Sequence, residues 1–167
     1  MPPAIGNTSA ADLFLHLQAK RAGKIKGEAA SAEHADDIEL CGWQWGLSAS
    51  SGLGNTHATS RRAYSALTVT KRIDSATTAL MSALATNDEI KEAKLTMRRA
   101  GGEQEDFFII TLNNARITSV QHEAGADGAT IETVAIAFIK VDVEYRPQKA
   151  SGQRAGSTMF SDELPQA

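Results

Sequence analysis

The sequence predicts a mainly β protein, a small barrel or sandwich with one short α-helix. Apolar residues alternate with polar ones in most segments, with the period of two that a half-buried strand requires. Glycine, asparagine and aspartate separate these segments, as they do in hairpin turns. One segment, residues 74–87, instead carries apolar residues at helical spacing. These patterns favour a barrel or sandwich that one helix covers.

The composition suits one domain and excludes several kinds of partner. A chain of 167 residues can bury a core without disulfides. Its 17 Lys and Arg against 20 Asp and Glu leave a net charge of -3, which gives no basis for binding nucleic acid. No apolar run approaches the ~20 residues of a membrane span, and the N-terminus lacks the pattern of a signal peptide. We therefore expect no nucleic acid, no membrane insertion and no cleaved export signal.

The predicted strands follow one another along most of the chain. In the first, residues 13–17, the leucines share one face. In residues 38–47 the alternation shifts by one position near Gly42, where a β-bulge would accommodate it. Further strands are expected at residues 67–73, 93–99, 107–112, 116–121 and 131–145. Hairpin turns are expected at Gly101–Gly102, at Asn113–Asn114 and at residues 125–129.

The predicted helix has Asp74 or Ser75 available to cap its first turn. A helix of ~12 residues is marginal alone, so its alanine-rich face should pack against a sheet. Residues 48–65 are expected to form a long loop, and such loops are usually functional or mobile. The polar tail after Pro147 is expected to be loosely ordered.

Two of the predicted strands are apolar on both faces. Residues 107–110 read FFII, and apolar residues occupy both sides of residues 131–145. A helix about 18 Å long can shield only part of such a surface. We therefore expect self-association, which we prefer to a monomer whose loops cover the sheet.

Both tryptophans of the chain lie two residues apart, in the segment WQWG. On a strand Trp43 and Trp45 share a face, and Gln44 points the opposite way. We assign the two tryptophans to core or subunit packing in preference to ligand stacking. Gln44 then faces either solvent or a cavity.

No catalytic or metal-binding motif stands out. Cys41 lies in an apolar segment, and we expect a small buried hydrophobic residue rather than a reactive thiol. The four histidines are far apart and lack metal-ligand spacing. A phosphate-binding loop and a nucleophile motif are also missing. We expect no cofactor and no metal, and the remaining possibility of a small β-barrel enzyme has no set of titratable residues to support it.

Several segments keep a common order over residues 12–149. They are DLFLHL at 12–17, IKGE at 25–28, DDIEL at 36–40, WQWG at 43–46, TVTKRIDSAT at 68–77, EAKLTMRRAGGEQEDFFIITL at 92–112 and ETVAIAFIKVDVEYRPQ at 132–148. Together they resemble the haemolysin-coregulated protein (Hcp) family of bacterial type VI secretion systems. The resemblance implies an N-terminal extension at 1–11, an Hcp-like domain at 12–149 and a C-terminal tail at 150–167. The domain would be a small ring-forming β-barrel, formed by two antiparallel sheets with one short α-helix.

The resemblance also implies a function. Members of the family form six-membered rings that stack into a tube, which a contractile sheath surrounds and a spike tips. Sheath contraction expels the tube, so the chain would be cytoplasmic before assembly and then secreted without a signal peptide. Rings also carry effectors in their lumen. The alternative is a dedicated effector-binding carrier ring with little role in the tube.

The family pattern assigns roles to particular residues. Gln44 matches a lumen-facing position that contacts effectors, with a plain exposed side chain as the alternative. Residues expected in core or subunit packing are Trp43, Trp45, Phe107, Phe108, Phe138 and Tyr145. Candidate ring-stacking residues are Arg61, Arg62, Arg98, Arg99 and Glu103. For the last three, and for Glu105 on the same Gly101–Gly102 turn, a solvated hairpin is preferred to a salt bridge between rings.

Overall fold

The fold consists of strands and one α-helix that follow closely along the chain. A computed structural model describes residues 11–49, 62–99, 105–147 and 156–165. The strands are β1 (Ala11–Ala19), β2 (Gly23–Ile25), β3 (Ile38–Glu39), β4 (Gly42–Gln44), β5 (Leu47–Ala49), β6 (Arg62–Tyr64), β7 (Leu67–Arg72), β8 (Ile90–Arg99), β9 (Asp106–Ala124), β10 (Thr130–Ala137), β11 (Lys140–Tyr145) and β12 (Thr158–Glu163). The helix α1 spans Thr77–Ala85, and a short 3-10 helix, η1, spans Ala32–His34.

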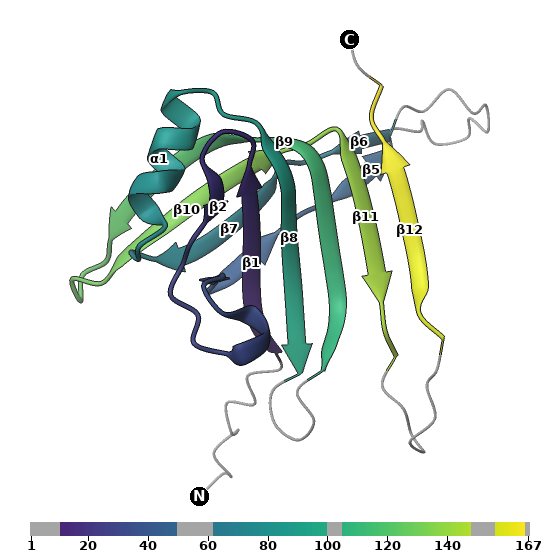
Figure 1. Cartoon of the computed structure of the whole chain (residues 1–167), viewed down its shortest axis with the longest axis horizontal. Coiled ribbons are helices and arrows are strands. Elements are labelled where there is room, and N and C mark those ends of the chain that lie inside the picture. Colours follow the sequence, from purple (N-terminus) through teal and green to yellow (C-terminus); the bar gives the residue numbers. More distant parts are fainter. Residues whose placement is uncertain (1–10, 50–61, 100–104, 148–155, 166–167) are drawn as a thin grey trace, which may run out of the picture.

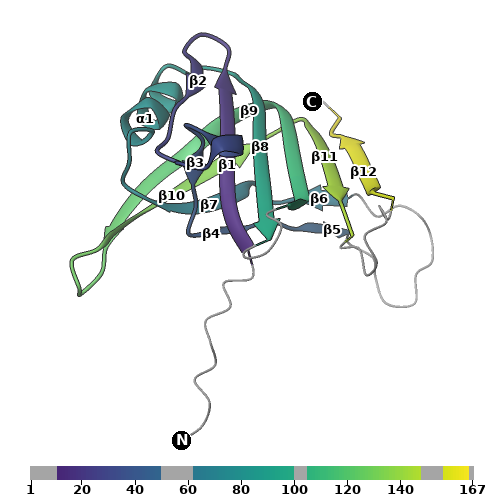
Figure 2. The same cartoon turned by 60° about the horizontal axis from the view of Figure 1, so that its bottom comes forward.

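Two antiparallel sheets enclose the core and share the long strand β9. One sheet has the order β2-β1-β8-β9-β11-β12, with β3 beside β1, and the other has the order β9-β10-β7-β4. Figures 1 and 2 show the two sheets crossing, with α1 at one end of the barrel. The predicted mainly β barrel with one helix is confirmed.

The strand β9 passes from one sheet to the other at Asn114. Its first part pairs with β8 and β11 as far as Ala115, and the part from Arg116 to Ala124 pairs with β10. Asn114 has φ 51°, in the left-handed region that asparagine tolerates better than most residues. The hairpin predicted at Asn113–Asn114 is therefore wrong, because this pair redirects one continuous strand.

The predicted strand over residues 131–145 divides at Phe138 and Ile139. Its first half is β10 in one sheet, and its second half is β11 in the other. Because the chain changes sheet here, Ile136 before the break and Val141 after it are both fully buried. The apolar residues on both sides of this segment thus face one core, and they expose less surface than the sequence suggested.

A loop covers part of the outer face of the larger sheet. The ring of His34, in η1, stacks on Phe14 of β1 with centroids 4.3 Å apart and planes 3° apart. The His34 ring nitrogens lie 3.1 Å from carboxylate oxygens of Asp37 and Asp106. Phe14 and Ile109, whose neighbours in the register place them on this outer face, are only 4% and 6% exposed. Loop cover, the alternative to self-association, therefore accounts for this part of the surface.

The helix α1 begins at Thr77 with Ala76 as its N-cap, and no side chain makes a capping hydrogen bond there. The predicted cap by Asp74 or Ser75 is therefore wrong, although both residues lie in the turn that leads into the helix. Asp74 Oδ1 accepts a hydrogen bond of 2.9 Å from the backbone N–H of Ala76, just before the helix. Leu80 and Ala83 are buried against the barrel. Asn87, with φ 54°, follows the helix end in the left-handed conformation.

Three expectations about order and burial are corrected. Cys41 is exposed, because it precedes the short edge strand β4 and lies outside the core. The tail is not loosely ordered throughout, since Thr158–Glu163 pairs with β11 along its whole length. Within the loop expected at 48–65, the described ends form the two-stranded sheet of β5 and β6, and residues 50–61 lie outside the described part.

Candidate assembly and cargo surfaces

The strand β4 separates Gln44 from the tryptophans, as the alternation predicted. Trp43 is half-buried and stacks on Phe108 of β9 across the barrel, with ring centroids 6.4 Å apart. Trp45 stacks on Tyr64 of β6 with centroids 5.6 Å apart. Gln44 is exposed. It can meet another molecule without any loss of core packing.

An aromatic cluster holds the base of the β5–β6 hairpin. Phe138, at the break between β10 and β11, meets Tyr64 edge-on at 5.5 Å and Trp45 at 6.4 Å between centroids. The backbone N–H of Ser65 donates to Gly46 O at 3.0 Å and closes the hairpin. The hairpin of β5 and β6 therefore starts from an ordered aromatic base.

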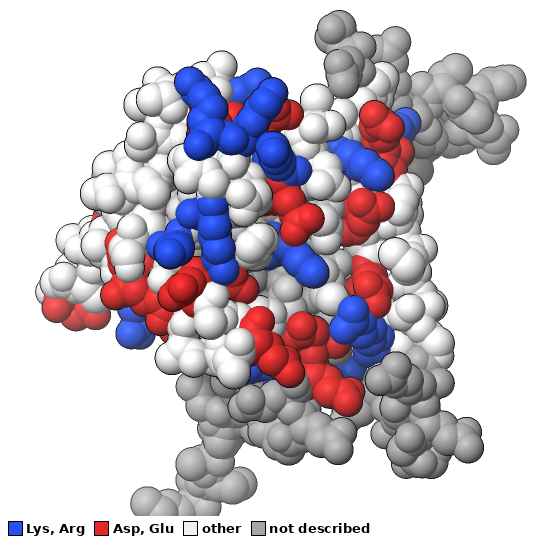
Figure 3. All heavy atoms as spheres, viewed as in Figure 1, with Lys and Arg blue, Asp and Glu red and all other residues white. Residues whose placement is uncertain are grey.

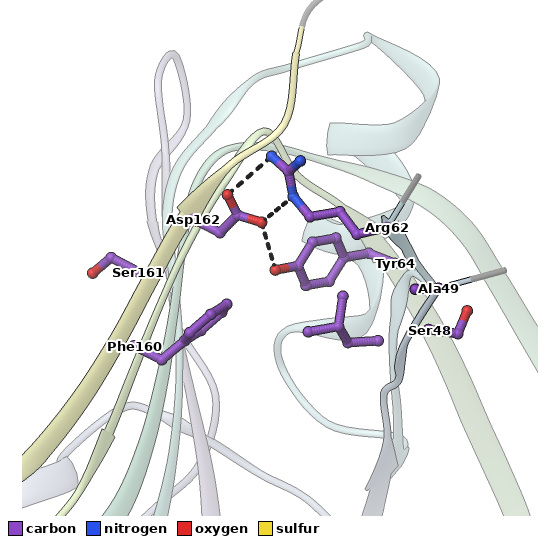
Figure 4. A pocket seen from close by; sticks show the side chains of 8 residues that line it. Ser48, Ala49, Arg62, Tyr64, Phe160, Ser161 and Asp162 are labelled. Carbon is purple, nitrogen blue, oxygen red and sulfur yellow. Dashed lines mark hydrogen bonds and ion pairs between the residues drawn. The ribbon is translucent and has the colours of Figure 1, made fainter. Parts of the chain in front are cut away.

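A groove opens between this hairpin and the C-terminal strand β12 (Figure 4). Its volume is about 480 Å³. Residues from three strands line it, namely Leu47, Ser48 and Ala49 of β5, Arg62 and Tyr64 of β6, and Phe160, Ser161 and Asp162 of β12. Leu47 and Phe160 are 48% and 44% exposed, so the groove offers an open apolar rim.

Asp162 forms the polar side of the groove and joins it to the hairpin. Arg62 Nη2 donates to Asp162 Oδ1 at 3.0 Å, and Arg62 Nε donates to Oδ2. The hydroxyl of Tyr64 donates to the same Oδ2 at 2.8 Å (Figure 4). These hydrogen bonds, first from Arg62 and then from Tyr64, lower the pKa of Asp162. Burial, with the Asp162 carboxylate second, raises the pKa of Tyr64 to about 12.

The predicted ring-stacking arginines occupy different surroundings. Arg62 is in the groove, while Arg61 and Glu103 lie outside the described residues. Arg98 is only 6% exposed, so the expectation of a solvated position is wrong for this residue. Its guanidinium lies 4.8 Å from the Phe14 ring centroid and donates to Asp12 Oδ2 at 3.1 Å, because the loop that contains η1 covers it.

Arg99 of β8 lies beside Phe107 of β9, and the predicted packing aromatics differ in exposure. The Arg99 guanidinium is 4.5 Å from the ring centroid of Phe107. Phe107 and Phe108 are half-buried, whereas Phe138 is buried. Tyr145 is 42% exposed and pairs with Phe108 and Thr158 in the register. Of the predicted packing residues, Tyr145 is the one most available to a neighbouring molecule.

Charges of both signs mix over the face that carries β1, β8, β9 and β11 (Figure 3). Lys and Arg lie among Asp and Glu there, without one sign covering the face. Within the described residues, no group of three or more His, Cys, Asp or Glu side chains could hold a metal ion. In the same part of the chain, no helix is long and apolar enough to cross a membrane.

Sequence reasoning missed the roles of Tyr64, Phe160 and Asp162. The segment TMFSDE does alternate, with Phe160 and Asp162 on one face and Met159 and Ser161 on the other. That alternation could have predicted the strand β12 from the sequence. Nothing in the sequence indicated that Asp162 would meet Arg62, one hundred residues earlier.

Comparison with known proteins identifies the family. Residues 14–145 match the family model described as type VI secretion system effector, Hcp. The chain is 36% identical over 151 residues to protein Hcp1 of Pseudomonas aeruginosa PAO1, covering 88% of this chain and 90% of that protein. This chain belongs to the Hcp family. The predicted family is therefore confirmed. Hcp proteins are the tube proteins of type VI secretion and are secreted.

Solved Hcp structures share the fold. Hcp1 of Salmonella typhimurium superposes with a TM-score of 0.73 at 26% identity, over 93% of this chain and 95% of that one. A structure described as a type six secretion system protein gives a TM-score of 0.82 at 25% identity, over 93% and 96% of the two chains. The Hcp fold therefore extends over nearly all of this chain.

Proposed function

We propose that the chain forms hexameric rings that stack into the inner tube of a type VI secretion system. Contraction of the surrounding sheath expels the tube together with its spike, and effectors travel in the ring lumen. The protein acts by assembly and displacement, without catalytic turnover. It is cytoplasmic before assembly and is then secreted. The observation that carries this proposal is the match of residues 14–145 to the Hcp family.

The exposed side chains near β12 support assembly from copies of the chain. Tyr145, Met159 and Phe160 are 42%, 68% and 44% exposed, and Leu47 lies across the groove. Within the described residues β12 pairs with β11 alone, so its other edge is unpaired there. An edge strand with apolar neighbours is a surface that another chain can cover.

Native mass spectrometry and electron microscopy test the ring. We expect particles of six chains with a central hole. A stable particle of 17.7 kDa at micromolar concentration would overturn the proposal. The Tyr145→Ser variant should weaken the ring, whereas Thr118→Ser, a small change on an exposed part of β9, should leave it intact.

For ring stacking, we assign the segment that contains Arg61 and Arg62. Deletion of residues 50–60 should spare hexamers and impair tubes, as seen by sedimentation and by secretion of the protein. Unaltered secretion of the deletion variant would remove this assignment. The Arg98, Arg99 and Glu103 group is a weaker candidate, because Arg98 is already engaged by Asp12.

Effector carriage is the second proposed role, with Gln44 as the lumen contact. Its support is the exposed position of Gln44, which points away from the half-buried tryptophans on either side of it. Gln44→Arg should abolish capture of at least one cognate effector in a pull-down while tubes still form. Gln121→Arg, the same change at an exposed position of β9, is the matched control. Unchanged binding of every effector by Gln44→Arg would contradict the role.

A further inference from the structure

Among the described residues, no strand pairing joins the β5–β6 hairpin to the two main sheets. Among the described strands, β5 and β6 pair with each other alone. Three paired positions join them, and most of their residues are exposed. A two-stranded hairpin of this kind is marginally stable in water unless it packs on something else. Side-chain contacts must therefore fix its position on the barrel.

The described contacts fall at two places along the hairpin. At its base, Trp45 and Tyr64 pack with Phe138. Farther out, at the residue where β6 begins, Arg62 reaches across the groove to β12. The base alone would leave the hairpin free to pivot, and the contact with β12 supplies the second point that fixes its angle.

The second contact has the geometry of a strong charged hydrogen bond. Arg62 approaches both oxygens of Asp162 and also donates to the backbone oxygen of Glu163 at 3.0 Å. Tyr64 adds a third donor to the same carboxylate. Exposed ion pairs are usually weak, but two-point arginine–carboxylate contacts within a network are the exception. Among the described residues, the Asp162 carboxylate is the one group of β12 that accepts hydrogen bonds from both Arg62 and Tyr64.

We propose that β12 is a clamp on the β5–β6 hairpin and that Asp162 is its positioning residue. The strand β12 depends on the hairpin in turn, because its own side chains are mostly exposed and it pairs with β11 alone among the described strands. The C-terminal strand thereby sets the direction in which the hairpin leaves the barrel. The hairpin carries Arg62, which we assigned to ring stacking. Any effect of the clamp on tube formation therefore rests on the proposed function.

Hydrogen exchange tests the clamp directly. Asp162→Asn keeps the shape of the side chain but removes the charge that Arg62 and Tyr64 bind. Glu163→Gln makes the same charge change at the next residue, which is exposed and whose side chain makes no hydrogen bond or ion pair among the described residues. We expect several-fold faster amide exchange in peptides covering β5, β6 and β12 of Asp162→Asn, with β8 and β9 unchanged. Exchange equal to that of Glu163→Gln would overturn the clamp.

Tyrosine ionisation gives a second measurement that a general loss of packing would not reproduce. In a Tyr145→Phe background Tyr64 is the remaining tyrosine, so its ultraviolet titration can be followed alone. The clamped Tyr64 should ionise near pH 12, and Asp162→Asn should move the midpoint downward with the fold intact by circular dichroism. An unmoved midpoint would contradict the contact with Asp162.

Measuring tube formation by Asp162→Asn distinguishes a failure of the clamp from a failure of the proposed function. Faster exchange with reduced stacking of intact hexamers supports the clamp and its role in the tube. Faster exchange with normal tubes supports the clamp and removes its role in stacking. Unchanged exchange overturns the clamp whatever happens to the tubes.

Discussion

Lys71 of β7 and Glu132 of β10 face each other in the register and form an ion pair of 2.8 Å, with neither side chain exposed. Asp74 lies 2.8 Å from the same ammonium group, and Thr77 donates a hydrogen bond of 2.7 Å to Glu132. The group ties the start of α1 to the sheet beneath it. The helix is thus positioned by charge as well as by its apolar face.

Removal of the cation should destabilise the fold strongly. Lys71→Met leaves the Glu132 carboxylate buried without the ammonium group that neutralises it, and we expect the free energy of unfolding to fall by about 3–5 kcal/mol. Lys71→Met combined with Glu132→Leu should recover part of the loss, because a buried apolar pair replaces the ions. Urea denaturation measures both. Lys91→Met, at an exposed position, should change stability by less than about 0.5 kcal/mol. A similar small effect of Lys71→Met would refute the prediction.

Trp45 carries a buried indole N–H with no acceptor among the residues that the structure describes. Trp45→Phe removes this donor and keeps an aromatic ring beside Tyr64 and Phe138. The smaller ring loses packing, but relief of an unsatisfied donor, about 1–3 kcal/mol, offsets much of that loss. We expect Trp45→Phe to cost under about 1.5 kcal/mol and Trp45→Ala to cost about 3–5 kcal/mol in thermal or urea unfolding. Equal costs for the two variants would contradict the prediction.

Position 114 should tolerate glycine better than a β-branched residue. Its φ of 51° suits glycine, whereas valine there is strained by about 1–3 kcal/mol. Asn114→Gly should therefore retain the fold with little loss, and Asn114→Val should lower the free energy of unfolding. Thr111→Val, in the regular part of the same strand, is the control and should be nearly neutral. Comparable stability of the two Asn114 variants would show that this conformation does not limit the fold.

Asp88 should make stability depend on acid pH. Burial would raise the pKa of its carboxyl, but hydrogen bonds from the backbone N–H groups of Arg21 and Ala22, with the Arg21 guanidinium, outweigh burial and lower it. The folded pKa then lies below the unfolded value of about 3.9. The stabilisation is therefore present at neutral pH and lost as the pH falls through the folded pKa.

The variant Asp88→Asn should show a smaller drop in unfolding free energy between pH 7 and pH 3 than the natural chain. Glu123→Gln makes the same charge change at an exposed residue of β9 and serves as the control. If the two variants follow the same pH profile, Asp88 does not contribute to acid sensitivity.

The sequence by itself determined the kind of fold and the family. Alternation identified β1, β7, β8 and the tryptophan strand, and helical spacing identified α1, because both periods follow from local backbone geometry. The same alternation placed Gln44 opposite to the tryptophans. The order of the family segments from residue 12 to residue 149 identified the family, on which the proposed function rests.

Only the tertiary structure decided where strands change sheet and what covers them. Asn113–Asn114 has the composition of a turn, yet pairing with β8, β10 and β11 holds β9 continuous through it. Arg98 stands in a charged, glycine-containing segment typical of a solvated hairpin, yet a loop from another part of the chain buries it. Asp162 meets Arg62 because two strands far apart in the chain reach one groove. Such contacts depend on chain reversals that local periodicity does not encode.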